Sequence, residues 1–268
     1  MTEPILSIRG LTKRFGGLVA VNDVSWDVYP GEVVALLGDN GAGKSTLIKC
    51  VSGVHPADEG EIFFEGRPSH FLRPIDARRQ GIETIYQDLA LANNLDVGAN
   101  IFLGREMKNS HLGGLVKTLN EARMLEESQS ALASLEIHFP SLTQPIESLS
   151  GGQRQAVAIA RAVYWDAKLM IMDEPTNNLG VPEQKKVLDL IRRLRDQGVP
   201  VILITHILPD VFAVSDRLMV MHRGRKVTEK IPSQTSTEEL VQYMVGARDD
   251  TSVGNVRENS LGPSADPS

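Results

Sequence analysis

Residues 38–46 read Gly-Asp-Asn-Gly-Ala-Gly-Lys-Ser-Thr and directly follow the apolar run Val33-Val34-Ala35-Leu36-Leu37. They match the pattern G-x-x-x-x-G-K-[ST], in which backbone N–H groups left accessible by glycine converge on phosphate oxygens at the start of a helix. The surroundings suit this motif, because a buried strand is predicted before it and an apolar helix over 47–51 after it. The stretch therefore predicts a nucleoside triphosphate site. The alternative, from these residues alone, is a glycine-rich turn with one exposed lysine.

The pattern also assigns contacts within this phosphate loop. Lys44 is expected to reach the β- and γ-phosphates, and the Ser45 hydroxyl is expected to ligate Mg²⁺. The other positions expected to contact the nucleotide are Gly38, Asn40, Gly41, Ala42, Gly43 and Thr46.

Composition limits the class of protein. The 268 residues suffice for one large domain or two small ones, and a net charge of −6 argues against nucleic-acid binding by bulk electrostatics. The single cysteine, Cys50, excludes an internal disulfide, indicates a reducing compartment and favours a buried thiol. No uncharged apolar run approaches the roughly 18 residues of a membrane span, and the N-terminus has no signal-peptide pattern. We expect a protein that is soluble by itself and can still dock on a membrane protein.

Apolar and alternating runs predict the first strands of the fold. These strands are expected within residues 5–8, 19–28, 32–37, 61–66 and 82–87. The last of them places Gln87 at a strand end, after a charged helical stretch over 73–79. Phe15 lies in the segment 13–17 between the first two strands, where a core or hairpin role competes with stacking on adenine.

The character of the chain changes at Asp88. From there to about Trp165 the apolar spacing predicts a mainly helical insert, with residues 110–117 as a loop rather than a site. Within it, Ser150-Gly151-Gly152-Gln153 precedes an alanine-rich helix. A serine cap and two glycines predict a second anion-binding helix start, whose partner could be a nucleotide held elsewhere; the alternative is an ordinary serine cap.

Two carboxylates follow the apolar run 168–172. A buried parallel strand that ends in Asp173-Glu174 should present both acids at the edge of the sheet where ligands bind. We expect Asp173 to hold Mg²⁺ and Glu174 to polarise the attacking water, with a solvated acidic turn as the alternative.

The remaining chain predicts another buried strand and a hairpin. Residues 182–198 form an amphipathic helix, and the strand 200–205 places His206 at the same edge, although a lone histidine is more often structural. Strands at 216–221 and 226–230 flank the hairpin turn Arg223-Gly224. Polar, Gly, Pro and Ser residues predict a disordered tail over 249–268.

This ordered set of motifs resembles the ATP-binding subunit of ABC transporters across residues 4–246. The resemblance implies an α/β fold, a P-loop NTPase (ABC ATPase) core with a mixed β-sheet, an N-terminal antiparallel β subdomain and a helical subdomain insert at about 89–165 within a domain of 1–248. It also implies a homodimer that closes head to tail on two ATP molecules. One chain would supply Lys44, Ser45, Gln87, Asp173, Glu174 and His206 to each site, and the other would supply the segment Ser150, Gly151, Gly152 and Gln153.

The resemblance gives further roles to three residues. Phe15 falls where the family stacks an aromatic ring on adenine. His206 matches the histidine that contacts the γ-phosphate. Gln87 matches the glutamine that ligates the metal and relays the presence of the γ-phosphate to the membrane subunit.

Finer similarity points to bacterial monosaccharide importers. The stretches 41–49, 81–91 and 100–106 look like those of single-domain fructose-type ATPases. This similarity implies ATP and Mg²⁺ as cofactors and integral-membrane permease subunits as partners, with a periplasmic sugar-binding protein acting indirectly and no nucleic acid. The expected location is the cytoplasmic face of the inner membrane.

Two alternatives and one departure accompany this interpretation. Phe15-Gly16-Gly17-Leu18 also occurs in importers of branched-chain amino acids, and a soluble, non-transport ABC ATPase is the other alternative. The family usually ends the loop after Pro175-Thr176 with Leu-Asp, whereas this chain reads Asn177-Asn178-Leu179-Gly180. We expect weaker coupling between the two sites, with hydrolysis retained because Glu174 and His206 are present.

Overall fold

The computed structural model describes residues 2–111, 116–139 and 141–250. Its central sheet has the strand order β12-β11-β3-β10-β9-β6, and all pairs are parallel except β11 with β12. These strands are β3 (Val33–Leu37), β6 (Ile82–Ile85), β9 (Leu169–Asp173), β10 (Val201–Ile204), β11 (Arg217–His222) and β12 (Arg225–Lys230). The predicted mixed sheet is therefore confirmed.

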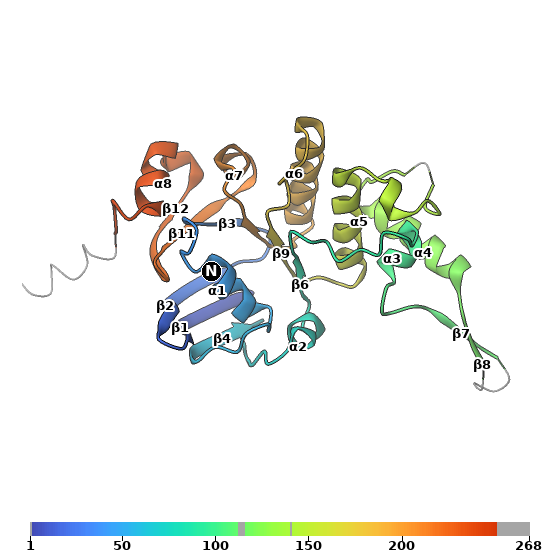
Figure 1. The fold of residues 1–268 in the computed structure, drawn as a ribbon, viewed down its shortest axis with the longest axis horizontal. Coiled ribbons are helices and arrows are strands. Elements are labelled where there is room, and N and C mark those ends of the chain that lie inside the picture. The colour runs from blue at the N-terminus through green and yellow to red at the C-terminus, as the bar shows by residue number, and fades with distance from the viewer. Residues whose placement is uncertain (1, 112–115, 140, 251–268) are drawn as a thin grey trace, which may run out of the picture.

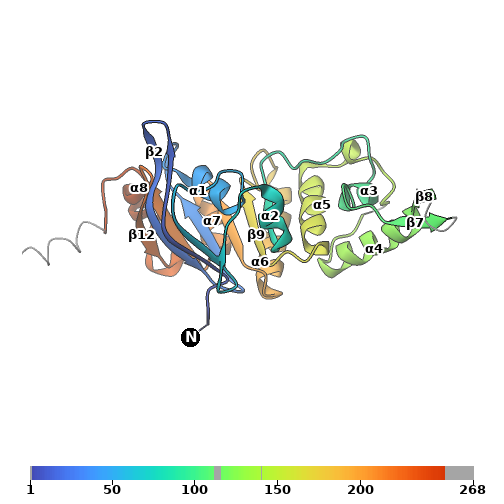
Figure 2. The same ribbon diagram turned by 90° about the horizontal axis from the view of Figure 1, so that it is seen from below.

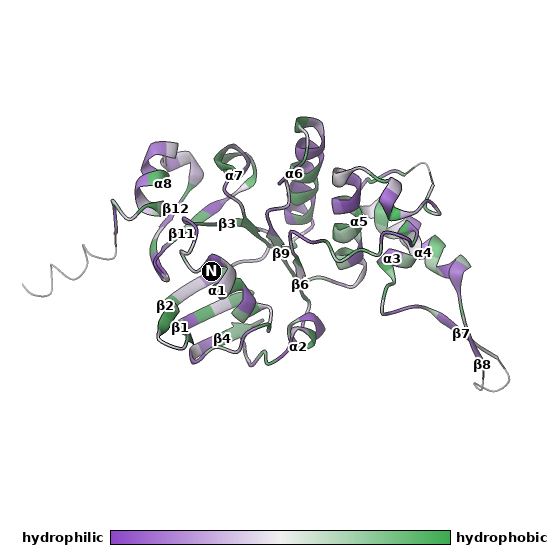
Figure 3. Ribbon diagram, in the orientation of Figure 1, coloured by the Kyte–Doolittle hydropathy of each residue, from purple (hydrophilic) through white to green (hydrophobic). Residues whose placement is uncertain are grey.

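The inner strands of this sheet are apolar because both of its faces are covered. All five residues of β3 are buried, as are the four of β10, and Figure 3 shows β3 and β9 coloured as hydrophobic. Such continuous apolar runs are expected of parallel strands.

A second, antiparallel sheet forms the predicted N-terminal β subdomain, in the order β2-β1-β4-β5. Its strands are β1 (Leu6–Phe15), β2 (Leu18–Val28), β4 (Glu59–Phe64) and β5 (Arg67–Ser69). Strand β1 is longer than predicted, since it includes Phe15. The pairing of β1 with β2 shifts in register between Ile8 and Leu11 and again between Leu11 and Arg14. These shifts interrupt the alternation of apolar and polar residues by which the second half of the strand could have been predicted.

Helices cover both faces of the central sheet (Figures 1 and 2). They are α1 (Lys44–Val51), α2 (Pro74–Arg79), α6 (Val181–Asp196), α7 (Leu208–Val214) and α8 (Thr237–Met244). Val34 and Leu36 of β3 pack with α1 and the antiparallel sheet, whereas Ala35 and Leu37 pack with α7 and α8. Cys50, on α1, is buried as expected.

The helical insert projects from the far edge of the sheet, beside β6 (Figure 1). It contains α3 (Val97–Ile101), the 3-10 turn η2 (Ile146–Ser148), α4 (Glu121–Ser134) and α5 (Gly151–Tyr164), and α5 also packs on α6. The predicted loop at 110–117 is wrong at its ends. A hairpin of β7 (Lys108–His111) and β8 (Val116–Leu119) occupies this place, and residues 112–115 lie outside the described residues. Strand β7 is wholly polar, and the apolar residues of β8, Val116 and Leu119, do not alternate with polar ones, so the sequence pattern did not indicate this hairpin.

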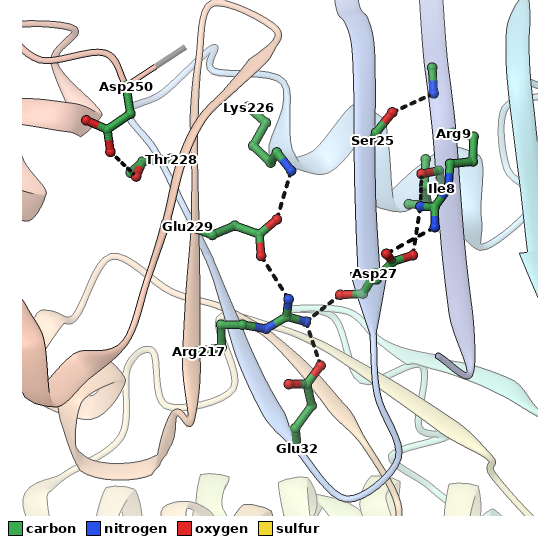
Figure 4. A network of polar contacts seen from close by, with 11 residues as sticks. Ile8, Arg9, Ser25, Asp27, Glu32, Arg217, Lys226, Thr228, Glu229 and Asp250 are labelled. Atoms are coloured by element: carbon green, nitrogen blue, oxygen red, sulfur yellow. Dashed lines mark hydrogen bonds and ion pairs between the residues drawn. The ribbon is translucent and has the colours of Figure 1, made fainter. Parts of the chain in front are cut away.

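A polar network ties the strands at the opposite end (Figure 4). Arg217 of β11 donates to Glu229 at 2.8 Å, to Glu32 at 2.7 Å and to the main-chain oxygen of Asp27. It thereby joins β11, β12 and the turn that precedes β3.

The first part of the predicted tail is held in place. The Asp250 carboxylate accepts hydrogen bonds from Thr228 at 2.7 Å and Tyr243 at 2.8 Å. The Thr228 bond is the main cause that lowers the pKa of Asp250 to about 2, against a smaller effect of burial. The predicted disorder of residues 249–268 is therefore wrong at its start, while residues 251–268 lie outside the described residues.

Candidate functional site

Four adjacent strands end at the same edge of the central sheet. The order β3-β10-β9-β6 brings together the segments that follow them, and the register pairs Ile204 with both Leu36 and Asp173. The phosphate loop follows β3, His206 follows β10, Glu174 follows β9 and Gln87 follows β6. Ligands of open parallel sheets bind at this edge, so the predicted residues from four separate segments converge as expected.

Two glycines of the phosphate loop, Gly38 and Gly43, have left-handed backbones and leave no room for a side chain. Gly38 has φ 147° and Gly43 has φ 98°. A Cβ on Gly38 would stand 2.3 Å from the Met221 carbonyl oxygen, and a Cβ on Gly43 would stand 2.5 Å from that of Ala20. Gly43 is the N-cap of α1, and no side chain caps this helix start. Its N–H groups thus remain available to an anion.

Lys44 points into its own loop. Its Nζ donates to the carbonyl oxygens of Gly38 at 2.8 Å and Asp39 at 3.1 Å. Burial lowers the pKa of Lys44, and the charges of Glu174, Asp39 and Asp173 oppose that shift. The lysine charge is therefore coupled electrostatically to both predicted carboxylates.

Asp173 and Glu174 lie in different environments although they are adjacent. Burial raises the pKa of Asp173, with a further contribution from the Glu174 charge, while Lys44 and Lys49 oppose the shift. Glu174 has a left-handed backbone with φ 54°, and its N–H donates to the Ile204 carbonyl at 2.8 Å. A strained non-glycine residue at such an edge is typical of a functional position.

His206 contacts Glu174. Its Nδ1 lies 3.0 Å from Glu174 Oε1, in hydrogen-bonding geometry, and 2.9 Å from Oε2. The Glu174 Oε2 atom is buried, yet the described residues offer it no hydrogen bond. At these distances His206 Nδ1 faces both oxygens of the Glu174 carboxylate and orients it at the edge of the sheet.

Gln87 is exposed in the loop that follows β6. Its strand pairs with β9, so Gln87 enters the same edge from the side of the helical insert.

A groove of about 510 Å³ runs from the phosphate loop to Phe15. The Phe15 side chain is 43% exposed, and its ring meets His55 edge to face with centroids 5.2 Å apart. The rest of the wall comprises Leu18, Val19, Ala20, residues 40–46, Arg223 and Gly224. From the sequence, Leu18, Val19, Ala20 and the Arg223-Gly224 turn were not assigned to this wall. Val19 and Ala20 were predicted only as strand residues and Arg223-Gly224 only as a hairpin turn.

The Ser150 segment lies apart from this groove. Ser150 Oγ accepts from the Gln153 N–H at 3.3 Å, and Gln153 Oε1 accepts from the Ser150 N–H at 2.9 Å, which makes a capping box at the start of α5. Gly152 is packed so closely that its Cβ would stand 2.9 Å from the Glu183 Cβ. Ser150, Gly152 and Gln153 instead border a separate cavity of about 280 Å³.

The fold and this edge define a nucleotide-binding ATPase with a phosphate loop. The model of the ABC transporter family matches residues 21–177, and the chain belongs to that family. It is an ATP-binding and ATP-hydrolysing subunit.

Known relatives extend over almost the whole chain. The xylose/arabinose import ATP-binding protein XylG of Sulfolobus acidocaldarius is 50% identical, over 90% of this chain and 93% of the relative. The fructose import ATP-binding protein FrcA of Rhizobium meliloti is 45% identical, over 92% and 96%. A solved ATP-binding cassette of an ABC transporter, MJ1267, matches with a TM-score of 0.76 and 28% identity, over 97% of this chain and all of that one. Within the described residues, no helix combines the length and the apolarity needed to cross a membrane.

Proposed function

We propose that this chain is the ATPase subunit of an importer of monosaccharides. The observation that carries the proposal is its 50% and 45% identity, over nearly full length, to subunits that import xylose or arabinose and fructose. A ribose import ATP-binding protein of Escherichia coli O157:H7 is also 41% identical over 91% of this chain, which spans 47% of that relative. Pentoses and hexoses are therefore the first substrates to test.

The edge of the sheet supplies the groups needed for ATP hydrolysis. In the proposed complex the adenine stacks on Phe15, and the phosphates lie on the N–H groups of the loop that Gly38, Gly41 and Gly43 keep open. Lys44 exchanges its two carbonyl partners for β- and γ-phosphate oxygens. These partners lie within the same loop, so the exchange needs only a side-chain rotation.

Glu174 is the proposed general base. One oxygen of its carboxylate would accept a hydrogen bond from the attacking water, while His206 Nδ1, 3.0 Å from Oε1 and 2.9 Å from Oε2, fixes the orientation of the carboxylate. His206 is 67% exposed at its side chain, which leaves its other ring nitrogen open to the γ-phosphate.

The donor set is suitable for Mg²⁺. Within the described residues no group of three or more His, Cys, Asp or Glu side chains forms a metal cage. One carboxylate, one hydroxyl and one amide, from Asp173, Ser45 and Gln87, instead leave coordination positions for phosphate and water oxygens, as Mg²⁺ prefers. A divalent cation would also stabilise the ionised form of Asp173, whose pKa is raised by burial and to a smaller extent by the Glu174 charge. Bound there, the ion would neutralise charge on the β- and γ-phosphates.

A second copy of the chain would complete the site. Ser150 is exposed at the start of α5 and lies outside its own nucleotide groove. We propose that Ser150, Gly151, Gly152 and Gln153 of one protomer contact the ATP of the other. The homodimer would act on permease subunits at the cytoplasmic face of the membrane, with ATP closing it and hydrolysis reopening it.

Sugar uptake by cells tests this function. A strain without this chain should lose ATP-dependent uptake of at least one labelled sugar among xylose, arabinose, fructose and ribose, and the intact chain should restore it. The Lys44→Ala variant should restore neither uptake nor ATP binding. Normal uptake of all four sugars, together with lost uptake of a branched-chain amino acid, would contradict the sugar assignment.

A further inference from the structure

The hairpin turn between β11 and β12 is attached directly to the phosphate loop. The Gly224 N–H donates to the Ala42 carbonyl at 2.9 Å, and the Asn22 N–H donates to the Gly224 carbonyl at 2.8 Å. A Cβ on Gly43 would stand 3.2 Å from the Gly224 Cα. The turn is therefore held by backbone hydrogen bonds against both the residues that precede α1 and strand β2.

This turn presents Arg223 to the nucleotide groove. Arg223 has φ 47° and Gly224 has φ 81°, the paired left-handed conformation of a tight hairpin. Arg223 borders the groove that contains Phe15 and the phosphate loop. Its side chain is exposed and forms no hydrogen bond or ion pair with the part of the chain that the structure describes.

The charge of the groove favours an anion beside Arg223. Among the described residues that border it, Lys44 and Arg223 are the charged ones, and both are cations. Lys44 donates to two carbonyl oxygens of its own loop, and the proposed function assigns it to the β- and γ-phosphates. Arg223 has no ion-pair partner among the described residues, and the adjacent Gly224 contacts Ala42 and Gly43, so Arg223 borders the groove next to the phosphate loop.

We propose that Arg223 binds the α-phosphate of the nucleotide. This assignment rests on the proposed function, in which adenine lies at Phe15 and the γ-phosphate at Lys44. The α-phosphate then lies between these ends, next to the start of α1 and the turn. A guanidinium there donates charge-assisted hydrogen bonds to a phosphate oxygen. Arg223 would thus add affinity that is common to ATP and ADP.

Competition binding distinguishes a contact of Arg223 with the α-phosphate from a contact with another part of the nucleotide. ATP, ADP, AMP and adenosine displace a fluorescent ATP analogue from the full chain, and each competitor is compared between wild type and Arg223→Gln. We expect a loss of about three- to tenfold in affinity for all three phosphorylated ligands, as for a solvent-accessible charged contact, with adenosine unchanged. Arg223→Lys should retain most of the affinity, and Arg223→Glu should lose more than Arg223→Gln.

Arg225 provides the matched control. It lies on the same hairpin and carries the same charge, but its guanidinium donates at 2.7 Å to the Asn22 side-chain oxygen, in the amide orientation that satisfies both partners. Arg225→Gln should therefore leave all four affinities within twofold. The proposal is overturned if Arg223→Gln changes no affinity, affects ATP alone, weakens adenosine equally, or is matched by Arg225→Gln. Unchanged ATP affinity in Lys44→Ala would instead reject the proposed nucleotide site itself.

Discussion

Arg161 holds the backbone of Ala90, in the loop that follows Gln87. Its guanidinium donates to the Ala90 carbonyl at 3.0 Å and to the Leu89 carbonyl at 3.1 Å. Ala90 has a left-handed φ of 49°, which costs energy for a residue with a Cβ. Arg161 belongs to α5, so the helix that starts at Ser150 is connected by these bonds to the segment that carries Gln87.

Arg161→Ala should destabilise the fold. The change leaves two carbonyls without their donor. It also removes a nearby positive charge from Glu83, whose pKa is raised by burial and partly lowered by Arg161. We expect a loss of about 1–3 kcal/mol in the free energy of unfolding, measured with urea and without nucleotide. Arg123→Ala, on the exposed face of α4, should change it by less than about 0.5 kcal/mol. A loss for Arg161→Ala as small as the loss expected for Arg123→Ala, below about 0.5 kcal/mol, would show that the Leu89 and Ala90 contacts contribute no stability.

The sequence was sufficient for the parts of the site that follow apolar strands. A motif or an acid at the end of such a run must lie at the sheet edge, and the structure places the phosphate loop, Glu174 and His206 there. The contact between Arg161 and Ala90 could not be read in this way, because it joins residues that are distant in the sequence. No period or composition specifies such a contact.

The same limit applies to the wall of the nucleotide groove. The dipeptide Arg223-Gly224 predicted a hairpin turn. Its position next to Ala42 depends on the pairing of β11 with β3, which the sequence does not specify. The 108–119 hairpin and the contacts of Asp250 could not be predicted from the sequence for a different reason. Backbone pairing and single hydrogen bonds impose no apolar pattern on a sequence.

Gly43→Ala should destabilise the chain more than Gly41→Ala. Both glycines have positive φ, 98° and 81°, but a Cβ at Gly43 meets the Ala20 carbonyl oxygen at 2.5 Å, whereas one at Gly41 has nothing within 4 Å. Thermal unfolding without nucleotide should therefore show a loss of about 1 kcal/mol for Gly41→Ala and at least about 2 kcal/mol for Gly43→Ala. Equal shifts in Tm would mean that the loop yields to the added methyl group.

Asp173→Asn should stabilise the protein and abolish its hydrolysis. Burial raises the pKa of Asp173 above its ordinary value of 3.8, so the stability that this group contributes is present below pH 3.8 and lost as the pH rises through the folded value. At pH 7 the folded state bears the cost of an ionised, half-buried carboxylate beside Glu174. Asparagine removes that charge, so Tm should rise by about 1–3 °C at pH 7 and the gain should shrink toward pH 4. A gain that persisted unchanged at pH 4 would point to a cause other than titration.

Glu174→Gln separates ATP binding from its hydrolysis. Glutamine retains an oxygen for His206 but cannot accept a proton from water, so the rate of phosphate release should fall by about 100-fold or more. Lys44 and the loop are unchanged, so ATP affinity should stay within about threefold, and the trapped ATP should make the dimer visible by size-exclusion chromatography. Glu147→Gln, which replaces an exposed carboxylate on η2, should hydrolyse ATP normally. A Glu174→Gln variant with the wild-type rate would mean that another group activates the water. The contact between Glu174 and His206 would then stabilise the strained turn rather than take part in the reaction.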